Sequence, residues 1–423
     1  MSRTRWSMAV AALALSTLAA TCGGTAASAS PRSGGRSGLT ASDTGVTPST
    51  ITIGLISSFS GPFSSTFADT ADGARARFAL QNAHGGVDGR KLKLITADDE
   101  SSLTATATAT QALLTKHPFG VIGFSGFLIG GAYRTLQQAG VPVTGGAFDG
   151  PEWGLPPNTN MFTYTGGVDP HYPASTLLGK FLKSVGAKSV ATLAFNNPSS
   201  TASILDQVES DTAAGLSNCY ENTSIPNGAV DLSVEVLAIK NAKCDATVAS
   251  FVDSSDIALS TQLQQAGLHP IELYYTGYDQ STLDQPSARQ AAQGDYFLAS
   301  TVPLTDKYPG AANFLGALKK YDPSYTGGIP DFGLIGGWLS ADLMIRGLEA
   351  AGKNPTRQAF IKKLRAVKGY DAEGLLPSPV TFQFGQVPKK GCAYVMQLKG
   401  DQFVVANGGK PACGQLIPNS NTR

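Results

Sequence analysis

The sequence has no concentration of charge of one sign along its length. Its 423 residues contain 32 Lys and Arg against 31 Asp and Glu, so the net charge is +1. Because no run rich in Lys or Arg stands out, a nucleic-acid partner or an anionic membrane partner has little support. The hydrophobic share of 42% is typical of an ordinary globular protein rather than a disordered one.

The sequence also lacks the motifs that mark common catalytic and metal sites. It contains no Walker A sequence, no H-E-x-x-H and no EF-hand loop. The segment Gly123-Phe124-Ser125-Gly126 is not a complete nucleophile elbow, and no His and acidic partners occur in triad order. Only four His residues occur, and they are scattered, which argues against metal catalysis. We therefore expect no enzyme activity, no metal and no cofactor, with an exported hydrolase as the remaining enzymatic alternative.

No apolar run is long enough to span a bilayer in the mature protein, but a shorter run opens the chain. Arg3 and Arg5 precede an apolar stretch at 8–18, and small residues follow it. This order of charged, apolar and small residues is typical of an export signal. We therefore predict a signal peptide at residues 1–21, the alternative being a buried N-terminal helix.

Cys22 stands directly after the small residues and before two glycines. This arrangement resembles a bacterial lipobox, in which the cysteine becomes the lipid-modified first residue of the mature protein. Thr21 replaces the usual Gly or Ala, and Ala19 stands where Leu is common. The resemblance implies a lipoprotein on the outer face of the cytoplasmic membrane.

The alternative is cleavage near Ala27 or Ala29, which would release a secreted or periplasmic soluble protein. Residues 22–46 are rich in Gly, Ser, Thr and Ala and show no periodicity. Such a composition predicts a flexible tether with a root-mean-square reach of roughly 25–30 Å.

Cysteine is rare, with five residues in the whole chain. If Cys22 carries lipid, four remain, and an even number in an exported chain suggests two disulfides. Of the three pairings that four cysteines allow, sequence proximity favours Cys219–Cys244 and Cys392–Cys413. A zinc site would need tighter spacing or nearby His, and the sequence offers neither.

Hydrophobic residues are present in a pattern that alternates between period two and period 3.6. Ile51, Ile53 and Leu55 alternate as in a strand, and apolar residues then recur at helical spacing over 67–78. Further strands are predicted at 92–98, 119–124, 189–195, 246–252, 273–275, 380–384, 394–398 and 403–405, and further helices at 103–116, 129–139, 201–214, 256–266 and 331–351. Two such blocks in series in a chain of this length predict two doubly wound α/β lobes with mostly parallel sheets.

The ordered succession of motifs from residue 50 to 405 resembles the leucine/isoleucine/valine-type solute-binding proteins, the branched-chain amino-acid branch of the type I periplasmic-binding proteins. The motifs that carry the resemblance are Ile53-Gly54-Leu55, Ser60-Gly61-Pro62, the segment 82–92, Asp98-Asp99-Glu100-Ser101 and Val121-Ile122-Gly123-Phe124-Ser125. The resemblance implies two Rossmann-like lobes joined by three crossovers, with the ligand in the cleft between them.

The resemblance also implies where the chain passes between the lobes. The crossings would fall near 164–169, near Ser300 and near 376–380. Lobe 1 would then comprise 47–167 and 300–376, and lobe 2 would comprise 168–299 and 377–423. Closure of such lobes on a ligand is a hinge motion.

Ligands of open parallel sheets bind beyond the carboxyl ends of the strands, where backbone N–H groups can hold an anion. Ser125, Gly126 and Phe127 follow a predicted strand and precede a predicted helix. The resemblance implies that the Ser125 hydroxyl, or the amide of Gly126 or Phe127, holds a ligand carboxylate. The alternative role for Ser125 is a helix N-cap.

Ala147, Phe148 and Asp149 lie at the next predicted strand end. The resemblance implies a backbone contact to the ligand at Ala147, and it places Asp149 where relatives commonly have Thr or Ser. A carboxylate there would repel an anionic ligand. Asp149 therefore either turns away as a surface residue or meets a cation or hydroxyl groups of the ligand.

Lobe 2 contributes candidates from two loops. The resemblance implies that Asp279 meets a ligand ammonium and that Tyr278 stacks on or covers the ligand, the alternative being a plain Asx-turn. Ser199 stands where relatives often place an aromatic residue over the ligand. Further residues expected near the cleft are Phe63, His171, Tyr172 and Asp253-Ser254-Ser255.

Together these features predict an exported, monomeric binding component of an ABC importer. It would capture a small amino-acid-like metabolite by hinge closure and hand it to permease subunits in the membrane. A tethered receptor that reports ligand occupancy to a signalling partner is the alternative. Amides, aromatic acids and short peptides are alternative ligands, because Asp149 and Ser199 depart from the branched-chain amino-acid pattern.

We predict that lipid on Cys22 anchors the mature protein. Labelled fatty acid supplied to producing cells should enter the wild type, because the modified cysteine would carry acyl chains. The Cys22→Ser variant should take up no label and should be shed into the medium. Equal labelling of both proteins would show that the anchor is wrong.

Overall fold

The computed structural model describes residues 38–153, 156–165, 174–305, 307–383, 390–418 and 420. The predicted signal peptide, Cys22 and most of the predicted tether lie outside the described residues, as do His171 and Tyr172. None of the helices in the described ranges combines the length and the hydrophobicity that crossing a membrane would require.

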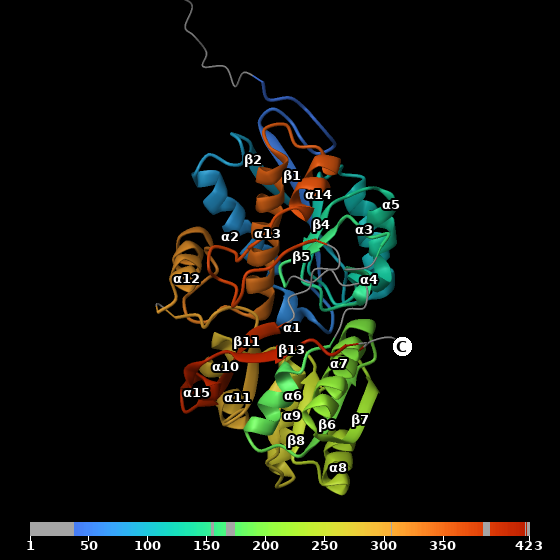
Figure 1. The fold of residues 1–423 in the computed structure, drawn as a ribbon, viewed down its shortest axis with the longest axis vertical. Helices are drawn as coiled ribbons and strands as arrows, with labels where there is room; N and C mark the ends of the chain where they lie inside the picture. Colours follow the sequence, from blue (N-terminus) through green and yellow to red (C-terminus); the bar gives the residue numbers. More distant parts are fainter. Residues whose placement is uncertain are drawn as a thin grey trace, which may run out of the picture. The chain divides into compact units, whose positions relative to one another are not determined.

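The first sheet has five parallel strands in the order β2-β1-β3-β4-β5 and lies in the upper half of Figure 1. Its strands are β1 (Thr50–Ser57), β2 (Lys91–Asp98), β3 (Gly120–Gly123), β4 (Val143–Gly145) and β5 (Met161–Thr163). Every residue of β3 and β4 is buried, as expected for central parallel strands that helices cover on both faces.

The helices of this half come from two distant parts of the sequence. The first part supplies α1 (Ser64–Phe67), α2 (Thr70–Ala83), α3 (Leu103–Leu114), α4 (Leu128–Gly131) and α5 (Tyr133–Gln138). The second supplies α12 (Pro309–Tyr321), α13 (Phe332–Ala351) and α14 (Arg357–Arg365). Helix α13 packs against α2, β3 and β4, so the chain returns to the first sheet after leaving it.

The contact between α13 and α2 is close enough to require glycine. A Cβ atom on Gly73 would lie 2.0 Å from the carbonyl oxygen of Leu334, and one on Gly337 would lie 1.9 Å from that of Thr70. Both distances are far below any real carbon–oxygen contact. The glycines therefore allow the two helix backbones to approach each other directly.

The second sheet has the order β12-β11-β10-β9-β8-β6-β7, with β13 paired to β11 beside this path. Its parallel strands are β6 (Ser189–Phe195), β7 (Ser217–Ile225), β8 (Ala246–Ser250), β9 (Ile271–Tyr274) and β10 (Tyr296–Ala299). Three antiparallel strands complete it, namely β11 (Lys390–Lys399), β12 (Gln402–Val405) and β13 (Ala412–Gln415). The helices of this half are α6 (Leu177–Ser184), α7 (Pro198–Ala214), α8 (Ser233–Ala242), α9 (Asp253–Gln265), α10 (Gln280–Asp284), α11 (Pro286–Ala291) and α15 (Ala406–Gly409).

Local chemistry explains the bounds of α7. The Asn197 side chain accepts a hydrogen bond from the Ser200 N–H at 2.9 Å, and Pro198 occupies the first helical position. Gly215, in the left-handed conformation at φ 76°, ends the helix. The predicted helix at 201–214 is confirmed, but it begins three residues earlier because of this cap.

Two predicted elements differ from the structure. The single helix predicted at 129–139 is divided into α4 and α5 at Ala132, whose φ of −125° is not helical. In place of the strand predicted at 380–384, the described residues contain only an isolated bridge between Val380 and Tyr370, and Phe384 lies outside them. The hydrophobic pattern did not indicate the antiparallel strand β13, which has four residues and no large apolar side chain.

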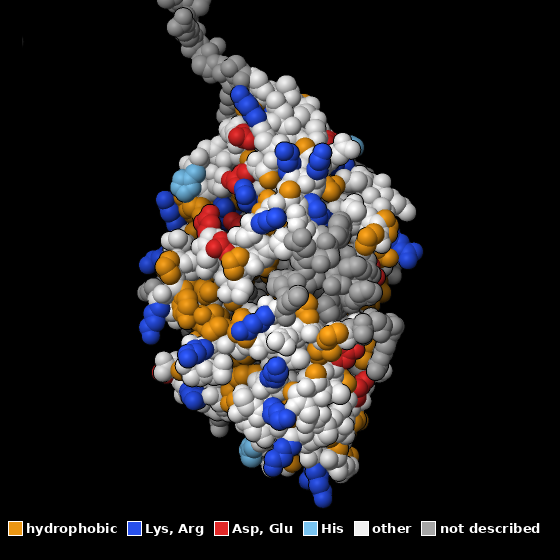
Figure 2. Space-filling view, viewed as in Figure 1, with side chains coloured by type: hydrophobic (Ala, Val, Ile, Leu, Met, Phe, Trp, Pro, Cys, Tyr) orange, Lys and Arg blue, Asp and Glu red, His pale blue; other side chains and the backbone are white. Residues whose placement is uncertain are grey.

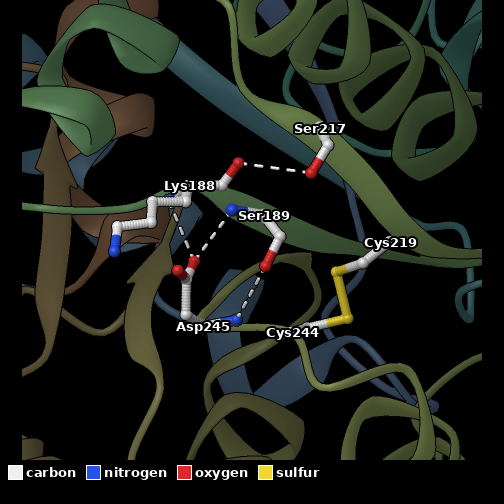
Figure 3. The surroundings of a disulfide bond; sticks show 6 residues. All are labelled: Lys188, Ser189, Ser217, Cys219, Cys244 and Asp245. Carbon is white, nitrogen blue, oxygen red and sulfur yellow. Dashed lines mark hydrogen bonds between the residues drawn. A yellow bond between two sulfur atoms is a disulfide. The ribbon is translucent and has the colours of Figure 1, made fainter.

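Both disulfides that sequence proximity favoured are present. Cys219 of β7 is joined to Cys244, which lies immediately before β8 (Figure 3). Beside this bond the Asp245 carboxylate accepts hydrogen bonds from the backbone N–H groups of Lys188 and Ser189 at 3.0 and 2.9 Å. These contacts tie together the starts of β6, β7 and β8.

The second disulfide links the two C-terminal antiparallel strands. Cys392 of β11 and Cys413 of β13 stand directly opposite each other in the strand register. The bond therefore fixes β13, which has only four residues, to the strand that leads into the sheet.

Carboxyl groups are buried in the second half without basic partners. The Tyr274 hydroxyl donates to the Glu272 carboxylate, and the Ser260 hydroxyl donates to Asp295 at 2.9 Å. Burial raises the pKa of Glu272 to about 7, and it raises that of Asp295 well above its ordinary value. Burial likewise raises the pKa of Asp211 to about 7, although Gln207 donates a hydrogen bond to it at 2.7 Å. The ion pairs of the described residues include none of these carboxylates.

The surface follows the dispersed charge of the sequence. On the face shown in Figure 2, the Lys and Arg side chains are dispersed, some of them beside Asp or Glu, rather than gathered into one patch. This distribution agrees with the absence of basic runs in the sequence.

We expect each disulfide to stabilise the fold mainly by restricting the unfolded chain. The bonds span 25 and 21 residues, and loops of this length contribute roughly 3 kcal/mol in the chain-entropy description. The double variants Cys219→Ala/Cys244→Ala and Cys392→Ala/Cys413→Ala should each lower the free energy of unfolding in urea by about that amount. Reduced wild type serves as the control and should lose the sum of the two. Variants as stable as the oxidised wild type would contradict this account.

We also expect stability to fall as pH rises from 5 to 8. Burial raises the folded-state pKa of Asp211 and Glu272 above the unfolded values near 4, so the folded state binds more protons between about pH 4 and 7. The resulting stabilisation is complete below the unfolded pKa and is lost as pH rises through about 7. Asp211→Asn should reduce the slope of unfolding free energy against pH by up to about 1.4 kcal/mol per unit.

The matched control for this measurement is Asp401→Asn, which removes one negative charge at an exposed turn position. Urea unfolding of the three proteins at several pH values gives the slopes directly. An Asp211→Asn slope equal to those of the wild type and the control would rule out the buried carboxyl as a source of the dependence.

Candidate functional site

A cleft of about 390 Å³ is lined by residues that follow strands of both sheets. Gly126 follows β3, Phe148 follows β4, Phe251 follows β8 and Thr276 follows β9. Parallel α/β sheets place ligands beyond the carboxyl ends of their strands, where loops supply the contacts. The cleft therefore occupies the position at which this architecture can best hold a small molecule.

An aromatic wall lines one side of the cleft, and we define it as Phe67, Phe148 and Phe332. The ring centroids lie 5.9 Å apart for Phe67–Phe148, 5.8 Å for Phe67–Phe332 and 5.8 Å for Phe148–Phe332. Phe332 is the first residue of α13, and Phe67 is the last residue of α1. Because α13 packs on α1 and α2, two segments distant in sequence combine to form the wall.

The polar lining of the cleft consists mainly of hydroxyl groups. Ser199, Ser200 and Ser203 lie in the first turns of α7. The Ser199 hydroxyl donates to the carbonyl oxygen of Phe148 at 2.8 Å, which links the second sheet's helix to the first sheet's loop. Burial raises the pKa of Tyr275, whose hydroxyl donates to Gln207 at 3.2 Å, so this phenol stays protonated at neutral pH.

Formal charge is scarce in the cleft. Among the lining residues that the structure describes, Lys390 is the one charged side chain, and neither Asp nor Glu occurs. Lys390 is the first residue of β11, is exposed, and is followed along the lining by Gly391, Cys392 and Ala393. The cleft thus offers apolar surface, neutral hydroxyls and one cation.

Of the first group of candidates, Gly126 lines the cleft, but Ser125 and Phe127 do not. The Ser125 hydroxyl donates to the Asp99 carboxylate and accepts from the Phe127 N–H at 3.0 Å. The Phe127 ring packs against Phe63 with centroids 5.0 Å apart. Ser125 therefore organises the start of the following helix in this structure, and its contact with a ligand stays a prediction.

The second group divides in the same way. Phe148 lines the cleft, whereas the Ala147 N–H donates to the Thr163 hydroxyl at 3.2 Å. The Asp149 carboxylate accepts from Trp153 Nε1 at 2.6 Å and from the Ile129 N–H at 3.0 Å. Burial raises the pKa of Asp149 to about 7. Asp149 is thus buried rather than at the surface and is not among the lining residues, and its contact with a ligand stays a prediction.

In the second sheet's half, Ser199 lines the cleft, and Tyr278 and Asp279 do not. The Tyr278 hydroxyl accepts from the Leu304 N–H at 3.1 Å, and its ring packs edge-on against Phe403. Asp279 is the N-cap of α10 and accepts from the Thr282 N–H at 2.8 Å. Asp279 thus caps a helix, which differs from the plain Asx-turn given as the alternative, and its pairing with a ligand ammonium stays a prediction.

A layer of carboxyl groups lies behind the cleft lining. The Thr276 hydroxyl, which lines the cleft, donates to Asp256 at 2.8 Å, and the Asp253 N–H donates to the Thr66 hydroxyl at 3.1 Å. Burial, with the charge of Asp279 adding to it, raises the pKa of Asp253 to about 7. The second contact joins α9 to α1 and is therefore another link between the two sheets' helices.

Sequence reasoning did not identify several lining residues. Tyr275 could have been found, because it ends the strand predicted at 273–275, and ligands of parallel sheets bind at the carboxyl ends of strands. Phe332 and Lys390 carried no such signal, since one begins a helix and the other begins an antiparallel strand. The lining segment 376–380 was predicted only as a crossover.

Comparison with known proteins extends these observations. The family described as "Periplasmic binding protein" matches residues 50–404. No curated protein matches the chain. Among solved structures, a fatty acid ABC transporter substrate-binding protein from Thermomonospora curvata is 18% identical, with a TM-score of 0.71, covering 90% of this chain and 95% of its own.

Two further structures share the fold at a similar level. A branched-chain amino acid ABC transporter protein from Thermus thermophilus with bound valine is 16% identical, with a TM-score of 0.71 and coverages of 86% and 96%. A solute-binding protein from R. palustris in complex with benzoate is 17% identical, with a TM-score of 0.70 and coverages of 88% and 98%. The family match spans most of the chain and includes both sheets. The chain therefore belongs to the periplasmic binding protein family, and it has the type I fold of these solved structures.

Proposed function

We propose that this protein captures a small organic solute in the cleft between its two sheets and delivers it to an ABC permease. The observation that carries the proposal is the cleft itself, which combines an aromatic wall with hydroxyl groups from α7. Ligand sites of this kind are largely apolar and contain a few placed polar groups. The volume of about 390 Å³ also falls within the usual range for small-molecule sites.

The proposed lobes are those expected from the sequence, 47–167 with 300–376 and 168–299 with 377–423. The packing of α13 on α2 supports the assignment of the later helices to lobe 1, and the pairing of β11 with β10 supports the assignment of the tail to lobe 2. A ligand that contacts both lobes would favour the closed arrangement, because it binds that state more tightly. The bond from Ser199 to Phe148 is a contact that closure would make.

The ligand class in this proposal is a small solute that carries a carboxyl group. The sequence favoured an amino-acid-like metabolite, and the three relatives are described with a fatty acid, valine and benzoate. These molecules share one carboxyl group and an apolar part, and this shared chemistry is what supports the class. We further propose that the protein acts as a monomer tethered to the outer face of the membrane through Cys22.

We predict that filling the cleft from α7 abolishes ligand binding. A library of amino acids and other small carboxylic acids is screened by thermal shift, and a bound solute at a hundred times its dissociation constant stabilises by about 2.7 kcal/mol. Ser203→Trp should eliminate the shift that the wild type shows, because the new side chain would occupy the cleft that Ser203 lines.

The control is Thr212→Trp on the same helix. Ser203 and Thr212 each donate their hydroxyl to the carbonyl four residues earlier, but Thr212 is exposed away from the cleft. The control should respond to the library like the wild type. An unchanged response of Ser203→Trp, or a wild type that responds to no solute, would refute capture in this cleft.

A further inference from the structure

The dimensions of the cleft favour a ligand with a sizeable apolar body. A buried apolar cavity of roughly 150 Å³ accommodates benzene, whereas the cleft measures about 390 Å³. Its aromatic wall presents three ring faces or edges on one side, and Val252, Leu298 and Leu376 add aliphatic surface. A ligand with little apolar surface would leave these side chains in contact with trapped water.

Among the lining residues that the structure describes, no carboxylate is present to pair with an ammonium group. The two acidic residues predicted at the site, Asp149 and Asp279, are not among the lining residues and accept hydrogen bonds from the backbone N–H groups of Ile129 and Thr282. Asp256 lies behind Thr276, whose hydroxyl donates to it at 2.8 Å. A buried cation without a carboxylate partner is strongly disfavoured, so an α-amino group would be a liability in this cleft.

An anionic group, by contrast, has a partner. Lys390 is the one charged residue among the described lining, and it stands beside Gly391 and Ala393, whose small side chains leave room next to it. No carboxylate of the described residues forms an ion pair with Lys390. Among the described residues, no carboxylate therefore competes with a ligand anion for this ammonium.

We infer that the ligand is an apolar monocarboxylate without an ammonium group, its body against the aromatic wall and its carboxylate at Lys390. This inference rests on the proposed function, since it concerns the same cleft. The sequence predicted that Asp279 pairs with a ligand ammonium. In this inference the ionic contact is instead between a ligand carboxylate and Lys390, the first residue of β11. The class includes arylalkanoic and medium-chain alkanoic acids.

The test uses three probes with one carbon skeleton, namely 3-phenylpropanoate, phenylalanine and 3-phenylpropanamide. Calorimetry on the full mature chain should show binding of 3-phenylpropanoate and at least tenfold weaker binding of the other two. Octanoate, an aliphatic acid of similar length, should also bind. Lys390→Gln should weaken the affinity for both acids at least tenfold, and Lys390→Arg should retain it.

The matched control is Lys399→Gln, which removes the same charge at the other end of β11 and should bind both acids like the wild type. Tighter binding of phenylalanine than of 3-phenylpropanoate would overturn the inference and leave solute capture intact. Equal affinity of the acid and the amide, or full affinity in Lys390→Gln, would also overturn it. Failure of both acids while another library solute binds would do the same, whereas the absence of any binder refutes the proposed function itself.

Discussion

The cleft depends on the almost direct backbone contact between α13 and the pair α1 and α2. A Cβ atom on Gly333 would lie 2.6 Å from the Thr66 carbonyl oxygen, and Gly73 and Gly337 are equally restricted. Any larger residue at these positions would separate the helices. Their approach places Phe332 at the start of α13 within 5.8 Å of Phe67, and so creates the aromatic wall. A local steric condition in one half of the molecule thus determines the chemistry of the ligand site.

Much of the fold could be predicted because parallel α/β structure leaves a strong periodic pattern. The strand at 189–195 follows from a short, mostly apolar run, the helix at 331–351 follows from a long apolar segment, and both disulfides follow from proximity. For the site, the sequence predicts only which residues follow the ends of strands, and three of these, Gly126, Phe148 and Ser199, line the cleft. The direction of a side chain could not be predicted, because Ser125 and Asp279 can each bind either a ligand or the N–H groups at the start of a helix. Phe332 and Lys390 reach the cleft through tertiary packing, which no local pattern encodes.

Acidic side chains in this protein serve the fold more than the cleft surface. Asp149, Asp279 and Asp331 each accept a hydrogen bond from a backbone N–H in the first turn of a helix. Glu272 and Asp295 are buried in the second sheet's half beside Tyr274 and Ser260. The lining is left to serines, threonines and aromatic residues. Such a surface recognises shape and apolar area more than positive charge.

One strand carries both the single charged lining residue and half of a disulfide. Cys392 itself lines the cleft, two residues after Lys390, and its bond to Cys413 holds β13 against this part of β11. While the thiols are reduced, β13 is held by its backbone hydrogen bonds to β11 and by its contacts with α6. The disulfide therefore adds a covalent link at the part of the lining that carries Lys390, so its reduction would loosen the wall at which the ligand is proposed to be held.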